Sequence, residues 1–437
     1  MVDTIIVGQA LGANALAGVS FTGSITFLIL GFVSGLTSGF SVVVSQRRGA
    51  RDEEGMRQSF ATGIVLTLII VSILTVAAVS VAKPLLVAMN TNTEFLPYSL
   101  EYIIPIFGGM LLSALYNQFS ATLRAIGDSV VPLYFLIFAS LLNGALDCLF
   151  VLAFGMGARG AAIATVTSNG VSAALTFAYM WIKYPTLRFN RKHFRPDLKQ
   201  YAAHIKLGLP MALQLSVVSI GMIFGQTALN TMNPIAQKSY AAASKIDGLA
   251  TSIINSAGAA AATFVGQNYG AKRYDRIKTG VYKFTLFMIG TCLVLAAIVL
   301  SLHRPLTMLF IAKDDRSEAM YGYALKYLSF NSGFYILLAT LCISRSSLQG
   351  MGRGTLALTA AVAEVVMRVG VALIAMHLNS FTIVCMGNAM SWVGANIILI
   401  PSYLIILHKY IPILGKNSIK YFRMPNPSYP PKYLNKQ

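Results

Sequence analysis

Charged residues are scarce in this sequence, and their scarcity excludes an ordinary soluble domain. Only 11% of the 437 residues are charged and 56% are hydrophobic, whereas a soluble domain carries about 25% charged residues. Apolar runs of about 20 residues recur along the chain, which is the length that a helix needs to cross a bilayer. The sequence therefore predicts an all-α polytopic membrane protein.

Enzyme and metal-site motifs are also lacking. The four cysteines lie in apolar runs without a CxxC spacing, and the five histidines form no HExxH pair. The only adjacent aspartates, Asp314 and Asp315, occur in DDRSE rather than in a DDxxD motif. GMGARG at 155–160 matches GxGxxG, but it joins two apolar runs instead of a strand and a helix. We therefore expect neither an enzyme nor a bound cofactor, and we interpret the cysteines as packing residues.

Acidic residues are outnumbered by basic ones, 15 to 34, which gives a net charge of +19. We do not expect nucleic-acid binding, because the interleaving of aromatic and basic residues typical of such surfaces is lacking. The basic residues instead suit cytoplasmic loops and contact with anionic membrane lipid. We therefore predict a multi-pass membrane protein with basic loops and C-terminus in the cytoplasm. Twenty-five of the 34 lie in the stretches 46–57, 124, 183–206, 272–283, 345–353 and 409–437.

The apolar runs predict eleven complete spans. The opening segment MVDTIIVG is apolar but too short to cross about 30 Å of hydrocarbon, so we interpret residues 1–16 as the second half of a first helix whose beginning is missing. The predicted spans are 18–44, 59–82, 101–122, 130–154, 160–183, 205–229, 240–266, 280–302, 320–348, 355–378 and 381–408.

Two pairs of similar segments indicate an internal repeat. SQRRGARDEEGMR resembles GQNYGAKRYDRIK with Gln46 and Gln267 in register, and LRAIGDS resembles LQGMGRG with Gly127 and Gly352 in register. Because both pairs follow even-numbered helices, the sequence predicts two six-helix lobes of the same orientation, with a substrate cavity near the midplane. The expected units are an N-terminal lobe 1–183, a linker 184–204, a C-terminal lobe 205–408 and a cytoplasmic tail 409–437.

Three acids lie within apolar runs, namely Asp3, Asp147 and Glu364. A central aspartate costs a spanning helix about 2.5–3.5 kcal/mol, which favours a functional role for Asp147 in LLNGALDCLFVLAFG. Asn143 lies four residues earlier on the same helix face, and Thr165 follows in the next predicted span. Their oxygens suit a hard cation, while a buried carboxylate alone could carry a proton. The remaining alternative is an aspartate that only locks two helices together.

Other polar residues in the apolar runs have two interpretations each. Asp3 could pair with Asp147, and two close carboxylates disfavour joint ionisation unless a cation lies between them; it could equally be solvated near the N-terminus. Glu364 and Arg368 have the i,i+4 spacing of an intrahelical ion pair, which could be structural or face the cavity. Gln214, after Pro210 at the start of its helix, could line the cavity or join two helices.

These residues carry a resemblance to a known family. VDTIIVGQALGANALAGVS, SQRRGARD, LRAIGDSVVP, LNGALDCLF, GARGAAIAT, GLPMALQ and GQNYGAKRYDR, together with LQGMGRG and AEVVMRV, resemble the DinF-like branch of the multidrug and toxic compound extrusion (MATE) family. The resemblance implies two six-helix lobes in a V and a cation site at Asp3, Asn143, Asp147 and Thr165. The sequence departs from the family in its incomplete first helix. It also lacks the acid that the NorM-like branch places after GLP, so a C-terminal cation site of that kind is not expected.

The resemblance implies a secondary active antiporter that exports organic, often cationic, compounds in exchange for H+ or Na+ by alternating access. A lipid-linked precursor flippase is the main alternative, with Lys245, Lys326 and Arg368 as candidate ligands for pyrophosphate. A plain channel and an intramembrane enzyme are weaker alternatives. We expect a small-molecule substrate and a monomer, with no cofactor beyond the coupling ion.

Overall fold

The computed structural model describes residues 2–407, apart from 90, 92, 196 and 311–316, and the side chains of 2–5, 9, 13 and 14 are not described. The described part is helical and contains no strand. Its elements are α1 (Val2–Leu11), α2 (Ala13–Gly49), α3 (Glu53–Ala88), α4 (Leu96–Gly108), α5 (Met110–Ile126), α6 (Val130–Asp147), a π-helical turn (Cys148–Ala153), α7 (Gly157–Lys183), α8 (Leu198–Asn230), α9 (Pro234–Gly270), α10 (Tyr274–Ser301), α11 (His303–Met308), α12 (Glu318–Gly333), α13 (Tyr335–Gly350), α14 (Gly354–His377) and α15 (Phe381–Ile405).

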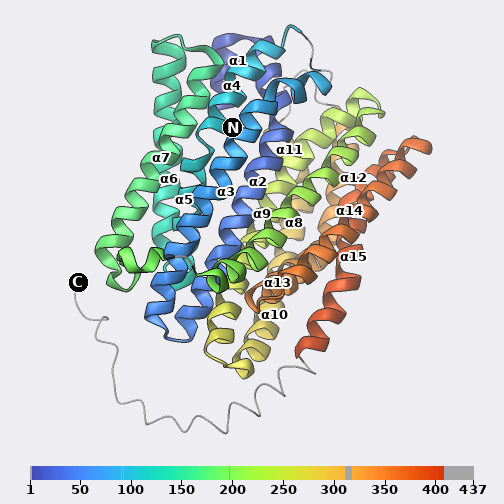
Figure 1. Cartoon of the computed structure of the whole chain (residues 1–437). Coiled ribbons are helices and arrows are strands. Elements are labelled where there is room, and N and C mark those ends of the chain that lie inside the picture. Colours follow the sequence, from blue (N-terminus) through green and yellow to red (C-terminus); the bar gives the residue numbers. More distant parts are fainter. Residues whose placement is uncertain (1, 90, 92, 196, 311–316, 408–437) are drawn as a thin grey trace.

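The helices form two lobes that lie side by side (Figure 1). The first lobe contains α1–α7 and the second α8–α15, and α2 packs against α8 and α9 of the other lobe. Within the described residues, nine helices are long and apolar enough to span a membrane, or up to eleven spans if each of two bent pairs is counted as one. The predicted class, an all-α polytopic membrane protein of two lobes, is confirmed.

The backbones of the two lobes repeat each other in detail. One span of each lobe is bent, by 49° after Gly108 and by 44° after Gly333. Each bent span is followed within two residues by a glycine with positive φ, Gly127 at 106° and Gly352 at 82°, a conformation in which a side chain would be strained. Both pairs are 225 residues apart, the same separation that LRAIGDS and LQGMGRG have in the sequence. The repeat is therefore structural as well as sequential.

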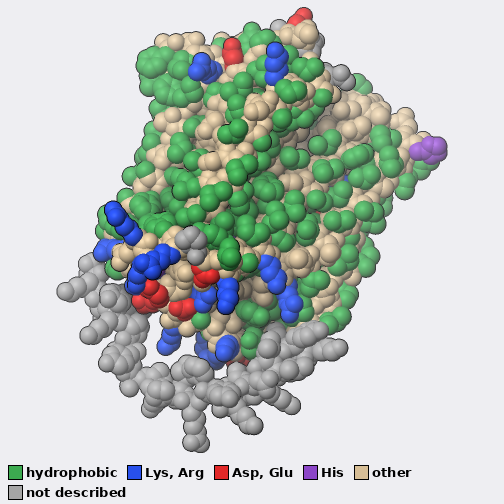
Figure 2. All heavy atoms as spheres, in the orientation of Figure 1, with side chains coloured by type: hydrophobic (Ala, Val, Ile, Leu, Met, Phe, Trp, Pro, Cys, Tyr) green, Lys and Arg blue, Asp and Glu red, His purple; other side chains and the backbone are tan. Residues whose placement is uncertain are grey.

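The outer surface fits a hydrocarbon solvent. Large apolar side chains are widely exposed, for example Ile73, Val76 and Leu141 at 67%, 68% and 71%. Figure 2 shows a broad hydrophobic face, with most Lys and Arg gathered at the lower end of the molecule. We call this the basic end; it contains the turns 50–52 and 271–273. An exposed apolar belt of this size is unfavourable in water and expected in lipid.

The two lobes are joined at the basic end by a reciprocal pair of hydrogen bonds, which we call the latch. Gln46 Nε2 of α2 donates to the Gly350 carbonyl of α13 at 2.8 Å, and Gln267 Nε2 of α9 donates to the Ala125 carbonyl of α5 at 2.8 Å. The donors are 221 residues apart and the acceptors 225, so the repeat places each bond opposite its equivalent.

Close helix packing brings the latch residues within reach of each other. A Cβ atom at Gly49 would collide with the Gln267 carbonyl, and one at Gly270 would collide with the Gln46 carbonyl. Glycine at these two positions thus allows the ends of α2 and α9 to touch. The lobes are therefore held together at the basic end from both sides.

The connection between the lobes differs in detail from the expected linker. It contains two 3-10 turns, Pro185–Leu187 and Arg191–Phe194, and α8 already begins at Leu198, inside the predicted linker 184–204. The Asp197 side chain caps this helix by accepting from the Lys199 N–H at 2.9 Å. Pro210 consequently lies inside α8 rather than near its start. The predicted tail 409–437 and the Asp314–Asp315 pair lie outside the described residues.

Candidate functional site

Asp147 is the last residue of α6 and is fully buried. The backbone changes directly after it to the π-helical turn Cys148–Ala153, a form that occurs mostly as short insertions and often at functional sites. Gly155, with a φ of 63°, then allows the turn into α7. The carboxylate therefore sits where α6 loses its regular hydrogen-bond ladder, a feature that the apolar run itself did not predict.

The structure brings the predicted partners Asn143 and Thr165 together. Asn143 Nδ2 of α6 donates to Thr165 Oγ1 of α7 at 3.2 Å, and Thr165 Oγ1 donates to the Ala161 carbonyl at 3.1 Å. Because Asn143 donates through its nitrogen, its carbonyl oxygen remains an acceptor. Carboxylate, amide carbonyl and hydroxyl oxygens thus lie on two adjacent helices, a donor set that fits H+ or Na+.

Asp128 fixes the register of these two helices from the basic end. Its Oδ1 accepts from the Val131 N–H at the start of α6, and its Oδ2 accepts from the phenols of Tyr184 at 2.7 Å and Tyr179 at 3.1 Å, at the end of α7. Burial, followed by the neighbouring Asp128 carboxylate, raises the pKa of Tyr184 well above its ordinary value. Tyr184 therefore remains a neutral donor.

Asp3 belongs to α1, whose side chains at residues 2–5 lie outside the described set. The helix itself packs against α2, α6 and α7. Val7 of α1 is buried in one cluster with Val151, Ala158 and Ala161. The backbone of α1 thus runs beside the helices that carry Asp147 and Thr165, while the pairing of Asp3 with Asp147 stays a prediction.

A fourth intramembrane acid, Asp247, was missed by the sequence analysis. It lies inside α9 with 6% of its surface exposed. Its Oδ1 accepts from the Tyr335 phenol at 2.8 Å and its Oδ2 from the Tyr327 phenol at 3.3 Å. The expectation of only three such acids is therefore wrong. The signal was weak because Asp247 occurs in AAASKIDGLATS, where small polar residues hide a single acid.

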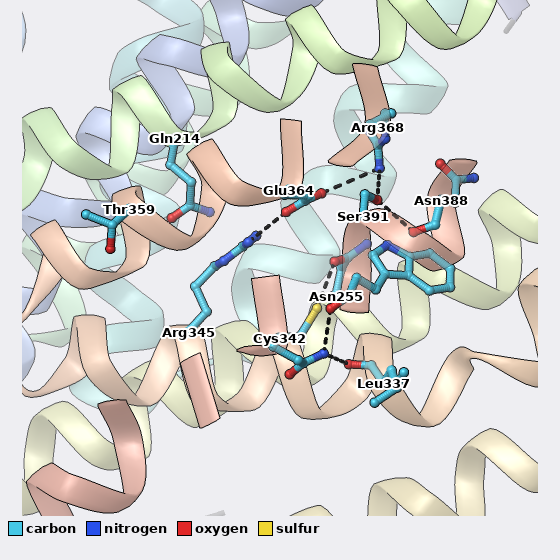
Figure 3. Close-up of polar contacts among 12 residues, drawn as sticks. Gln214, Asn255, Leu337, Cys342, Arg345, Thr359, Glu364, Arg368, Asn388 and Ser391 are labelled. Carbon is cyan, nitrogen blue, oxygen red and sulfur yellow. Dashed lines mark hydrogen bonds and ion pairs between the residues drawn. The ribbon is translucent and has the colours of Figure 1, made fainter. Parts of the chain in front are cut away.

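Glu364 and Arg368 belong to a buried triad in the C-terminal lobe (Figure 3). Their closest nitrogen and oxygen atoms are 3.5 Å apart, and a shorter ion pair of 2.7 Å joins Glu364 to Arg345 of α13. Arg368 also donates to Ser391 Oγ of α15 at 2.9 Å. The third member, Arg345, was not expected, because it comes from another helix. The triad holds one net positive charge and ties α13, α14 and α15 together.

Gln214 lines a cavity between the lobes, which we call the polar cavity. Gln349 Nε2 of α13 donates to Gln214 Oε1 at 2.8 Å, so Gln214 also joins two helices. The cavity has a volume of about 260 Å³ and is lined by α2, α5, α8, α9 and α13, including Arg124 and Asn255. Both interpretations of Gln214 thus fit its position.

A second, larger cavity lies beside the polar cavity and farther from the basic end. Its volume is about 700 Å³, and its lining contains apolar, hydroxyl and amide side chains, including Phe27, Tyr102 and Asn117, but no charged residue. We call it the apolar cavity. Leu215 lines both cavities, and Ser34 of the apolar cavity is followed in α2 by Gly35 of the polar cavity.

The residues suggested for a flippase are not gathered around one site. Lys245 and Lys326 are exposed, and Lys326 Nζ donates to Thr382 Oγ1 at 3.0 Å. Arg368 pairs with Glu364. None of the three lines the polar or the apolar cavity.

Comparison with known proteins gives the family. A family model described as MatE matches residues 1–149 and 210–374. The chain belongs to the MatE family. The resemblance to MATE transporters is thereby confirmed, and the enzyme alternative is excluded because these proteins are transporters. The DinF-like branch stays a prediction.

Two relatives from Bacillus subtilis (strain 168) are similar to this MatE protein. "Probable multidrug resistance protein YpnP" is 31% identical over 63% of this chain and 62% of the relative. "Probable multidrug resistance protein YoeA" is 28% identical over 72% of this chain and 70% of the relative. The match therefore spans less than two thirds of the length of YpnP.

A MATE protein solved in complex with MaL6 has the same fold. The TM-score is 0.87 at 24% identity, and the match covers 95% of this chain and 92% of the other. At this identity the similarity establishes the two-lobed architecture.

Proposed function

We propose that this MatE protein is a secondary active efflux antiporter, which exports organic compounds in exchange for H+ or Na+ by alternating access. The observation that carries the proposal is the buried carboxylate of Asp147, one helical turn after Asn143, whose amide donates to Thr165 of the next spanning helix. The names of YpnP and YoeA as multidrug resistance proteins support export of small molecules. We propose a monomer in the bacterial inner membrane, surrounded by lipid, with the basic end in the cytoplasm and without nucleic-acid or cofactor binding.

In this proposal the latch closes the cytoplasmic side, and the described conformation faces outward. A cation enters and binds to Asp147, Asn143 and Thr165, with Asp3 as a fourth candidate ligand from the DinF-like pattern. Binding changes the packing of α6 and α7 and weakens the hold on the substrate. Coupling requires that the cation bind the two states with different affinity, which a carboxylate with a conformation-dependent environment provides.

The test is gradient-driven dye movement in vesicles. We expect Asp147→Asn to abolish efflux that is driven by a pH or Na+ gradient, because the neutral amide can neither take up a proton nor balance Na+. Applying each gradient alone identifies the coupling ion. Asp275→Asn, which removes an acid that is 70% exposed in its side chain, is the control and should retain efflux. Unchanged gradient-driven efflux by Asp147→Asn would exclude the assignment.

A further inference from the structure

The polar cavity offers hydrogen-bond donors and a positive charge. Arg124 of α5 lines it, and no hydrogen bond or ion pair of this guanidinium occurs among the described residues. None of the residues that line the cavity is acidic. A partly buried guanidinium without a carboxylate partner is unfavourable unless water or an anion satisfies it.

The two amides in the cavity lining add further donors. Gln214 Oε1 accepts from Gln349, and Asn255 Oδ1 accepts from the Cys342 thiol at 3.3 Å. Since both amide oxygens are engaged, the NH2 groups are the free ends of Gln214 and Asn255. Both residues lie on the C-terminal lobe, whereas Arg124 lies on the N-terminal lobe. The donors therefore face one space from two sides.

The charge of the neighbouring residues has the same sign. Ser346, which lines the cavity, is preceded by Arg345 of the triad, where two arginines share one glutamate. The apolar cavity lies next to this space, with Leu215 in both linings, and its own lining contains no charge and two aromatic residues, Phe27 and Tyr102. A polar, positively charged cavity thus neighbours a larger apolar one.

From this arrangement we infer that the substrate is an amphiphilic organic anion, whose carboxylate or phosphate binds Arg124 in the polar cavity while its apolar body occupies the apolar cavity. Arginine matches both groups, because its planar guanidinium donates two parallel hydrogen bonds to them. The inference rests on the proposed export function and replaces the expectation of cationic substrates. The latch lies beside the same site, since Ala125 accepts the bond from Gln267.

The experiment measures binding of carboxyfluorescein, an anion, and of rhodamine 6G, a cation, to the purified full chain in nanodiscs by fluorescence anisotropy. We expect the anion to bind at least tenfold more tightly. Arg124→Gln should weaken anion binding about tenfold or more, as loss of a charge-assisted hydrogen bond does, and should leave the cation unaffected. Arg124→Lys should retain part of the affinity, which separates loss of charge from misfolding.

Arg276→Gln is the matched control, because it removes an exposed positive charge from the same end of the molecule. It should leave both affinities unchanged. The anion could be a lipid headgroup or a soluble compound, and repeating the measurement with and without phosphatidylglycerol distinguishes the two. Competition by this lipid assigns the site to a lipid headgroup, and lack of competition assigns it to a soluble compound. Equal binding of carboxyfluorescein by Arg124→Gln and the parent, or preference of the parent for rhodamine 6G, would overturn the inference. If rhodamine 6G is exported and carboxyfluorescein is not, the inference on the substrate is overturned, while the proposed export function stands.

Discussion

The two lobes share a backbone plan but differ in how they hold buried charge. Their bends, left-handed glycines and latch bonds occur in equivalent pairs. In the N-terminal lobe, the buried Asp147 lies one helical turn after Asn143, whose amide donates to Thr165. In the C-terminal lobe, Glu364 pairs with two arginines, and Asp247 accepts from two phenols. The equivalent backbones of the two lobes thus carry different buried charged groups.

This difference separates two roles. The Glu364 carboxylate balances the buried positive charge of Arg345 and Arg368, which favours a structural role for the triad. Asp147 instead lies where the regular hydrogen-bond ladder of α6 ends, one helical turn after Asn143, the setting proposed above for the coupling cation. We therefore expect the N-terminal lobe to bind the coupling ion and the triad to stabilise the C-terminal lobe. We expect the two lobes to share a gate at the latch, where their structures repeat.

The largest expected effect is on stability, from Glu364→Gln. The substitution leaves Arg345 and Arg368 buried without their carboxylate, which should lower the free energy of unfolding by about 3–5 kcal/mol. Denaturant unfolding of the purified chain measures it. The control is Glu318→Gln, which removes an exposed ion pair with Arg304 of 2.6 Å and should lower it by less than about 1 kcal/mol. Equal losses for the two variants would show that the triad is not a stabilising element.

Sequence reasoning succeeded where a signal was local. The span pattern, the repeat and the Asn143–Asp147 face follow from hydropathy and spacing alone. It failed for Asp247, because neighbouring serine and alanine residues masked the acid, and for Arg345, because its partner is 19 residues away on another helix. The π-helical turn after Asp147 was also missed. Such features depend on tertiary packing that a single sequence does not display.

A smaller loss of stability is expected from Asp247→Asn. Asp247 is the buried acid of the C-terminal lobe that does not belong to the triad. Two phenols donate to this carboxylate, and a hydrogen bond to a charged group contributes about 1.5–3 kcal/mol. We expect a loss in this range, together with retained gradient-driven efflux. Tyr335→Phe should give a loss of the same order, because it removes the 2.8 Å donor. Loss of gradient coupling in Asp247→Asn would instead place a second coupling acid in the C-terminal lobe.

The smallest effects should come from the latch, where the lobes are alike. Gln46→Ala and Gln267→Ala each remove one neutral hydrogen bond between the lobes, worth about 1 kcal/mol, so each should raise the fraction of molecules open at the basic end about fivefold. Spin labels at Arg51→Cys and Lys278→Cys, both exposed and on opposite lobes, report this opening. The exposed Cys148 is first replaced by serine, so that it does not take up a label. Gln226→Ala, which removes an exposed bond within α8, should change nothing.

The decisive feature of this measurement is the ratio of the two latch variants. If the repeat makes the two bonds energetically equivalent, both substitutions must open the basic end by the same factor, and the double variant by about the square of that factor, because the donors act at separate acceptors. A factor for Gln46→Ala that differs severalfold from that for Gln267→Ala would mean that only one bond holds the gate. The two lobes would then be equivalent in backbone structure only, and their contributions to the gate would differ, as their buried charges do.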